Sequence, residues 1–279
     1  IDENGKDRVI HRLRSASIGE QVQLLRNFAK KEPDAVVMEC MAVNPQYQWI
    51  AEQKMIQSTI SVITNVRPDH LDEMGITLTD NAMSLSNTIP YNGTMVTVEG
   101  DLNRDGKLDE LDQQINDVLM DVTKKRNTKL SHASSENISS EYMGKFEYLE
   151  HIDNVALALE VCKLSGVEEK IALDGMIRAQ PDPGAAIIWE LNFSGTHNYF
   201  VNLLAANDPS STYNIYQNIL PRMGDCPTCI FLNTRSDRRY RTHQLLDLVF
   251  NKIKPTMLII RGEKLPKQFY NYQKNNPKI

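Results

Sequence analysis

Apolar residues recur at helical spacing over residues 19–31, and shorter apolar runs follow them along the chain. The runs DAVVMEC (34–40) and TISVITNV (59–66) predict buried strands, the first ending at Glu39 and the second at Asn65. The segment QWIAEQKMIQ (48–57) between them has the spacing of a helix. Strands that alternate with helices predict an α/β fold with a parallel sheet, whose ligands gather at the carboxyl ends of the strands.

The pattern continues to a break at AQPDPG, residues 179–184, which we take as a domain boundary. Before the break we expect a helix that runs into a turn over 77–93, a strand at 94–98, and helices at 110–125 and 151–166. Beyond the break, three strands at 199–208, 228–234 and 256–262 alternate with helices. The prediction is therefore a central domain over residues 1–180 and a second, incomplete Rossmann-like α/β domain over residues 181–279.

Composition narrows the class of protein. The 279 residues are 41% hydrophobic and carry a net charge of −5, which argues against nucleic acid as the main partner. No apolar run approaches the length of about 20 residues that a membrane span needs. The first residues are too polar for a signal peptide, and the absence of an initial methionine predicts a further segment upstream. Four cysteines without framework spacing favour a reducing compartment, and the pair in GDCPTC predicts a turn more strongly than a zinc site.

The richest stretch for chemistry is TNVRPDHLDEMG, residues 64–75, directly after a predicted strand. Asp69 and His70 are placed to hold a hard cation such as Mg²⁺, and Glu39 at the end of the neighbouring strand would complete the site. The alternative is structural: His70 caps a helix and Asp69 is its N-cap residue.

A second stretch, VEGDLNRDGKLDELDQQIND at 98–117, follows the spacing of a calcium loop. Its candidate ligands for Ca²⁺ are Asp101, Asn103, Asp105, the carbonyl of Lys107, and Asp112. The alternative is a polar loop in which Asp109 or Glu110 starts the next helix, with acidic side chains that complement the helix dipole. In either case the loop is a peripheral feature.

Several motifs in order resemble one family. TNVRPDHLDEMG resembles the central-domain signature of the Mur ligase superfamily, which includes folylpolyglutamate synthase. The other motifs are similar to the ligase subunit of capsular poly-γ-glutamate synthase: ECMAVNPQYQ (39–48), TIPYNG (88–93), QPDPG (180–184), AANDPSST (205–212) and RSDRRYRTHQ (235–244). The similarity runs from about Ile18 to about Gly262 and is weakest over residues 101–130.

The resemblance implies ATP-dependent ligation of an acid to an amino acid through an acyl phosphate. It places Glu39 and His70 at Mg²⁺ near the γ-phosphate of ATP, with Asn65 and Asp69 beside them. On the nucleotide side it implies Asn154, Asn207 and Asp208. A basic motif adds Arg235, Asp237, Arg238 and Arg241, which suits phosphate or a polyanionic glutamate chain. The arginine cluster is also compatible with a solvated helix start.

The chain departs from the family pattern at three places. It contains no G-x-x-x-x-G-K-[ST] loop for the β- and γ-phosphates. Leu85 and Ser86 fall near the place of a lysine that many Mur ligases carbamylate, and Ala185–Ile187 stand where an arginine is expected after PDPG.

The resemblance also implies partners: glutamate, a growing γ-glutamyl chain, and membrane subunits of a capsule synthase at the cytoplasmic face. A homo-oligomer is compatible with the sequence. Two alternatives stay open. One is a related ligase acting on a folate or a peptidoglycan precursor; the other is a catalytically silent scaffold with a calcium-binding loop.

Overall fold

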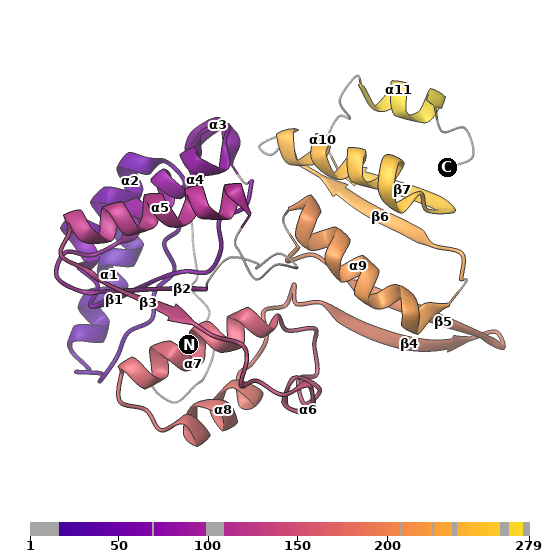
Figure 1. Ribbon diagram of the computed structural model, residues 1–279. Coiled ribbons are helices and arrows are strands. Elements are labelled where there is room, and N and C mark those ends of the chain that lie inside the picture. The colour runs from indigo at the N-terminus through magenta and orange to yellow at the C-terminus, as the bar shows by residue number, and fades with distance from the viewer. Residues whose placement is uncertain are drawn as a thin grey trace. The chain divides into compact units, whose positions relative to one another are not determined.

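A computed structural model describes residues 17–68, 70–98, 109–206, 208–224, 226–235, 239–262 and 268–275. The chain divides into two compact units (Figure 1). The first comprises Ile1–Val66, His70–Ser139 and Ile152–Ala179; the second comprises Arg67–Asp69, Ser140–His151 and Gln180–Ile279.

The first unit is built on a parallel sheet of the order β1-β2-β3. Its strands are β1 (Ile60–Ile63), β2 (Thr94–Val98) and β3 (Lys129–Ala133). Ile60 pairs with Thr94, and Thr94 pairs with Lys129. The middle strand is the most deeply buried, because it has a neighbour on each side. The predicted strands at 59–66 and 94–98 are thus present as β1 and β2.

Helices cover both faces of this sheet, with α4 and α5 on one side and α7 and α8 on the other (Figure 1). The helical elements of the unit are α1 (Ile18–Ala29), α2 (Pro45–Ile50), the π-helix η1 (Ala51–Ile56), α3 (Leu71–Met74), α4 (Leu78–Leu85), the 3₁₀-helix η2 (Ser86–Thr88), α5 (Glu110–Lys125), α7 (Ile152–Leu164) and α8 (Glu169–Arg178). The core under α4 and α5 consists of Ile63, Ala82, Ile89, Met95, Ile115, Leu119 and Val122. Because α4 begins at a capping box, in which Thr77 and Asp80 satisfy each other's main-chain N–H groups, its start is fixed by sequence.

The strand predicted at 34–40 is absent, and this prediction was wrong. Residues 35–43 have no regular structure, and Val37 is 95% exposed. An apolar run becomes a strand only where a neighbouring strand supplies hydrogen bonds, and β1 pairs only with β2 within the described part of the chain.

The second unit contains a hairpin and a separate parallel pair. Strands β4 (Ile187–Phe193) and β5 (Thr196–Asn202) are antiparallel and are joined by Ser194 and Gly195, which both have positive φ, as tight hairpin turns require. Strands β6 (Cys229–Thr234) and β7 (Met257–Gly262) are parallel. The helical elements are α6 (Ser140–Met143), α9 (Pro209–Met223), α10 (Arg239–Leu248), the π-helix η4 (Val249–Ile253) and α11 (Gln268–Asn275).

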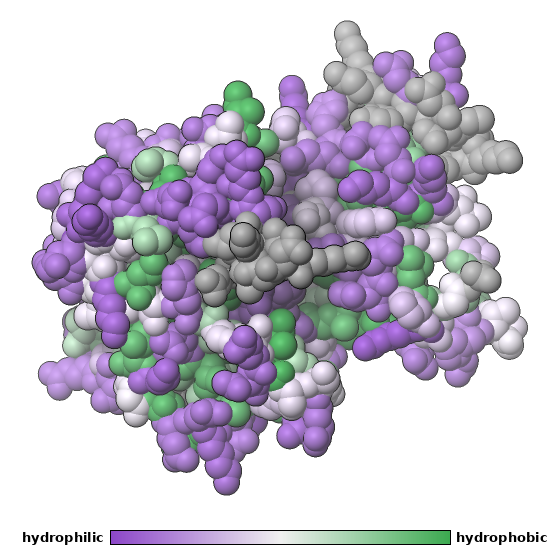
Figure 2. Space-filling view, viewed as in Figure 1, coloured by the Kyte–Doolittle hydropathy of each residue, from purple (hydrophilic) through white to green (hydrophobic). Residues whose placement is uncertain are grey.

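Two clusters form the core of the second unit, around Leu246 with Phe250 and around Leu248 with Ile253. Figure 2 shows mainly hydrophilic side chains on the viewed face, interrupted by separate apolar patches. No helix within the described ranges combines the length and the apolar content that crossing a membrane requires.

Candidate functional site

The loop that leaves the carboxyl end of β1 carries the predicted site residues Asn65 and His70. Asn65 is exposed, and His70 is half-buried. His70 has a left-handed backbone, with φ 47° and ψ 45°, and is the N-cap residue of α3. Left-handed backbone is uncommon for a residue other than glycine and is concentrated at functional sites.

His70 supports α3 through its main chain. Its carbonyl oxygen accepts hydrogen bonds from the N–H groups of Glu73 at 2.9 Å and Met74 at 2.8 Å. Its side chain makes no capping hydrogen bond. The structural alternative is therefore half right: the N-cap position belongs to His70 rather than to Asp69, which lies outside the described residues.

The segment that carries Glu39 is tied to α3 by one side chain. Asn44 donates a hydrogen bond from Nδ2 to Oε2 of Glu73 at 3.1 Å, and its Oδ1 accepts from the N–H of Gln46 at 3.0 Å, which caps α2. Glu39 itself is exposed in irregular backbone. The contact holds the segment that follows Glu39 next to the helix that His70 begins.

The donor set of this region fits a cation that binds mainly water and phosphate. Within the described ranges, no group of three or more His, Cys, Asp or Glu side chains could hold a metal ion by itself. Mg²⁺ is normally held by one or two carboxylates, with waters and substrate phosphates completing its octahedron. Glu39 carries a carboxylate of the kind that could serve Mg²⁺ bound together with a nucleotide.

Arg67, in the same loop, groups with the second unit. Its guanidinium donates a hydrogen bond to the hydroxyl of Ser211, and its Nη1 lies 3.9 Å from Oδ2 of Asp208. Asp208 is the N-cap residue of α9, where its Oδ1 accepts from the N–H of Ser211 at 2.8 Å. The carboxylate of Asp208 thus caps the helix with one oxygen and faces Arg67 with the other. Sequence reasoning had not assigned Arg67 a role, although it lies within the motif TNVRPDH.

The remaining predicted residues are dispersed. Asn154 is exposed in the first turn of α7, Arg235 is exposed directly after β6, and Arg241 is half-buried in α10. Asn207, Asp237 and Arg238 lie outside the described residues. Arg239 and Tyr240, at the start of α10, are exposed.

The calcium-like loop is only partly described. Asp101, Asn103, Asp105 and Lys107 fall outside the described ranges. Asp112 lies in the first turn of α5, and its N–H donates to Oδ1 of Asp109 at 2.7 Å. Asp109 is the N-cap residue, as the alternative reading of this loop predicted. No described contact supports calcium binding.

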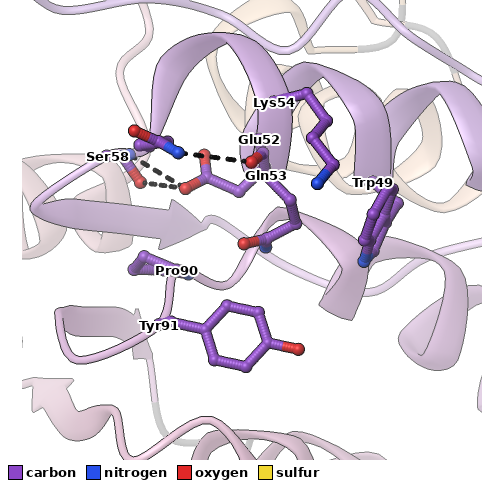
Figure 3. A pocket seen from close by; sticks show the side chains of 8 residues that line it. Trp49, Glu52, Gln53, Lys54, Ser58, Pro90 and Tyr91 are labelled. Carbon is purple, nitrogen blue, oxygen red and sulfur yellow. Dashed lines mark hydrogen bonds between the residues drawn. The ribbon is translucent and has the colours of Figure 1, made fainter.

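A pocket that the sequence did not predict lies at the other end of the strands (Figure 3). It has a volume of about 440 Å³ and is lined by Trp49, Glu52, Gln53, Lys54, Gln57, Ser58, Pro90 and Tyr91. Ser58 comes shortly before β1, and Pro90 and Tyr91 come shortly before β2. Because the strands are parallel, this pocket is at their amino ends, whereas Asn65 and His70 follow a carboxyl end.

Comparison with known proteins supports the resemblance found in the sequence. Residues 188–277 match the family model of the poly-gamma-glutamate synthase CapB C-terminal domain. The chain is 40% identical over 249 residues to PGA synthase CapB of Bacillus subtilis (strain 168), covering 88% of the chain and 60% of that protein. It is 39% identical over 248 residues to capsule biosynthesis protein CapB of Bacillus anthracis, covering 88% of the chain and 51% of that protein. The chain thus spans between half and two thirds of the length of these relatives.

Solved structures show the same fold. Folylpolyglutamate synthase from Thermotoga maritima superposes with a TM-score of 0.54 at 14% identity, covering 91% of this chain and 60% of that one. A mutant of L. casei FPGS superposes with a TM-score of 0.52 at 12% identity, covering 90% and 68% of the two chains. The matches confirm the predicted Mur-ligase-like α/β fold and the similarity to poly-γ-glutamate synthase.

Proposed function

We propose that this chain belongs to an ATP-dependent ligase that joins glutamate through γ-amide bonds in the synthesis of a capsular poly-γ-glutamate. The observation that carries the proposal is the 40% identity to PGA synthase CapB along 88% of the chain. Support comes from the left-handed His70 at the carboxyl end of β1, the edge of a parallel sheet where ligands gather.

The reaction has two balanced steps. A terminal carboxylate oxygen attacks the γ-phosphorus of ATP, which forms an acyl phosphate and releases ADP. The amine of the incoming amino acid then attacks the acyl carbon, loses a proton and expels phosphate. Since little covalent chemistry falls to the protein, its residues act by positioning the reactants and by compensating charge.

Each predicted residue takes a role in this scheme. Glu39 and His70 would hold Mg²⁺, which neutralises charge on the transferring phosphoryl group when bound. Asn65 and Asp69 belong to the same motif as His70, and Asn154, Asn207 and Asp208 would contact the nucleotide. The basic motif with Arg235, Asp237, Arg238 and Arg241 suits the phosphate or the polyanionic product. Membrane subunits at the cytoplasmic face are the partners that such a synthase would use.

The test is the release of ADP by the full-length protein in the presence of Mg²⁺, with and without glutamate. We expect glutamate to stimulate release, and the variant His70→Ala to abolish the stimulation. His197→Ala is the matched control, because His197 is exposed on the β4–β5 hairpin, 3.7 Å from Glu190. Absence of ADP release by a folded wild-type protein would overturn the ligase and favour a ligase-like scaffold. Stimulation by a folate or peptidoglycan precursor in place of glutamate would favour a related ligase.

A further inference from the structure

Helix α4 turns two polar side chains, Asn81 and Ser84, toward the interior of the first unit. They are 1% and 3% exposed, and residues three positions apart lie on the same face of a helix. In α2, which packs against α4, the side chain of Gln48 is also buried, at 1% exposed. A buried polar side chain is costly unless it is hydrogen-bonded, so the partners of these three side chains show what each of them holds.

The first chain of contacts runs from Ser84 to the segment of Glu39. The hydroxyl of Ser84 donates a hydrogen bond to Oε1 of Gln48 at 3.0 Å, and Nε2 of Gln48 donates to the carbonyl oxygen of Val43 at 3.3 Å. Val43 is the last residue of the irregular stretch 35–43, which carries Glu39. No main-chain N–H of a described residue donates to that carbonyl oxygen. The side chain of Gln48 therefore ties the Glu39 segment to α4.

The second chain of contacts runs from Asn81 to α3. Nδ2 of Asn81 donates to the carbonyl oxygens of Gly75 at 3.0 Å and Thr77 at 2.9 Å. Gly75 is the C-cap residue of α3, the helix whose N-cap residue is His70. Oδ1 of Asn81 is buried and accepts no hydrogen bond from a described residue, which lowers stability. The two carbonyl groups that it holds therefore explain an asparagine at this position better than the stability of the interior does.

We propose that the buried polar side chains of α4 are positioning residues for the candidate metal site. Ser84 acts through Gln48 on the segment of Glu39, and Asn81 acts through α3 on the segment of His70. Both segments and both helices belong to the first unit, so the arrangement lies within one compact part of the chain. Contacts that hold ligand-bearing groups in place affect metal affinity strongly, and Mg²⁺ demands near-ideal octahedral geometry. The inference rests on the proposed function and adds to it the residues that fix the metal site.

The test measures metal binding directly and does not depend on turnover. Mn²⁺ replaces Mg²⁺ as a paramagnetic probe, and water-proton relaxation reports its binding to the full-length protein in the presence of a non-hydrolysable ATP analogue. We expect Gln48→Leu and Ser84→Ala each to raise the dissociation constant of Mn²⁺ about tenfold. Thr123→Val is the matched control and should bind like the wild type, because the buried hydroxyl of Thr123 donates within α5, to the carbonyl oxygen of Met120 at 2.9 Å.

Combined variants separate the two chains of contacts. Ser84→Ala added to Gln48→Leu should cause no further loss, because both changes break the same chain of contacts. Asn81→Leu added to Gln48→Leu should weaken binding by about a further tenfold. Because Asn81→Leu also removes the unpartnered acceptor, this single variant should unfold within about 4 °C of the wild type and still bind Mn²⁺ about tenfold more weakly. A merely structural role would lower stability and affinity together.

Unchanged Mn²⁺ binding in folded Ser84→Ala and Asn81→Leu, or an equal loss in Thr123→Val, would overturn the proposal. Ser84→Ala removes a single hydroxyl, so it keeps the test valid if Gln48→Leu fails to fold. If the wild type releases ADP in response to glutamate while the variants bind Mn²⁺ normally, this inference fails and the ligase stands. If the wild type neither binds Mn²⁺ with the analogue nor releases ADP, the proposed function fails as well.

Discussion

The side-chain amide of Asn44 donates a hydrogen bond of 3.1 Å to the carboxylate of Glu73. The contact joins two segments that are separate in the sequence. One is the irregular stretch that follows Glu39, and the other is the short helix α3, whose N-cap residue is His70. Asn44 also caps α2. One residue thus fixes the start of α2 and the distance of its own segment from α3, which makes it the simplest way to perturb the candidate metal site without altering its ligands.

We predict that Asn44→Asp raises the Mg²⁺ concentration needed for half-maximal ADP release severalfold. Aspartate keeps the acceptor that caps α2, but it loses the amide donor and places a second negative charge beside Glu73. The double variant Asn44→Asp with Glu73→Gln should restore the Mg²⁺ dependence, since the glutamine amide can donate to the new carboxylate. A double variant that remains as impaired as Asn44→Asp would show that the contact does not position the site.

Arg126 should be irreplaceable by lysine. Its guanidinium donates hydrogen bonds to the carbonyl oxygens of Ser86, Asn87 and Ile89, and burial lowers its pKa. All three bonds come from Nη1, and the shorter lysine side chain does not place its ammonium at that position, so carbonyl groups would lose their donor. We expect Arg126→Lys to lower the free energy of unfolding in urea by about 1–3 kcal/mol. Arg178→Lys, where the arginine is exposed on α8, should change it little, and equal losses in the two variants would contradict this role.

Two glycines should respond oppositely to alanine. Gly262 has φ +116°, and a Cβ there would overlap the carbonyl oxygen of Thr234 and lie 2.9 Å from its Oγ1. We expect Gly262→Ala to destabilise the protein by about 1–3 kcal/mol or more. Gly175 lies within α8, and a Cβ there meets nothing within 4 Å. Gly175→Ala should therefore stabilise the protein by about 0.5–1 kcal/mol, as thermal unfolding would report.

Tyr148 should be among the last tyrosines to ionise. Burial, followed by the nearby Glu150 carboxylate, raises the pKa of its phenol to about 12. The unfolded phenol has a pKa of about 10. The folded state thus holds the proton more tightly, so the stability from this group is complete below about pH 10 and is lost as pH rises toward 12.

The wild-type protein should therefore lose stability relative to Tyr148→Phe as pH rises above about 10. Urea unfolding at about pH 9 and pH 11 measures the change. Because the chain has ten tyrosines, the difference in phenolate absorbance between the wild type and Tyr148→Phe gives the pKa of this residue. A difference signal that appears near pH 10 in the folded protein would refute the prediction.

Local sequence patterns were sufficient to predict most helices and strands of the first unit. The remaining elements depend on tertiary contacts. The helix predicted at 151–166 is present as α7. It could be predicted because its apolar spacing and Gly166, which follows its end, lie within one continuous stretch of sequence. The run at 34–40 has the composition of a strand but pairs with no neighbouring strand among the described residues. Strand β3 (KLSHA) was not predicted, because its mostly polar sequence has no apolar run. It is a strand because it forms hydrogen bonds with β2. The β4–β5 hairpin was likewise missed at its Ser194–Gly195 turn.

The candidate site also has features that the sequence pattern predicts and features that depend on tertiary contacts. Asn65 and His70 could be found from a motif, because residue types and order are written in the sequence. The left-handed backbone of His70, the Asn44–Glu73 contact and the pairing of Arg67 with Asp208 depend on how distant segments meet. The pocket of Trp49 and Tyr91 combines residues about forty positions apart, and no spacing rule links them.

The parallel register of the first unit also governs how the protein folds. Each strand pairs with residues 34 or 35 positions away, as Ile60 does with Thr94 and Thr94 with Lys129. No hairpin can nucleate this sheet. One long connection must close before the first ladder hydrogen bonds form and a second before the sheet is complete, and the closure entropy of each comes first. Helices such as α5 and α7 can form early from local contacts, whereas the end of β1 that precedes Asn65 and His70 is fixed only when β1 pairs with β2. We therefore expect the site to assemble late in the folding of this unit.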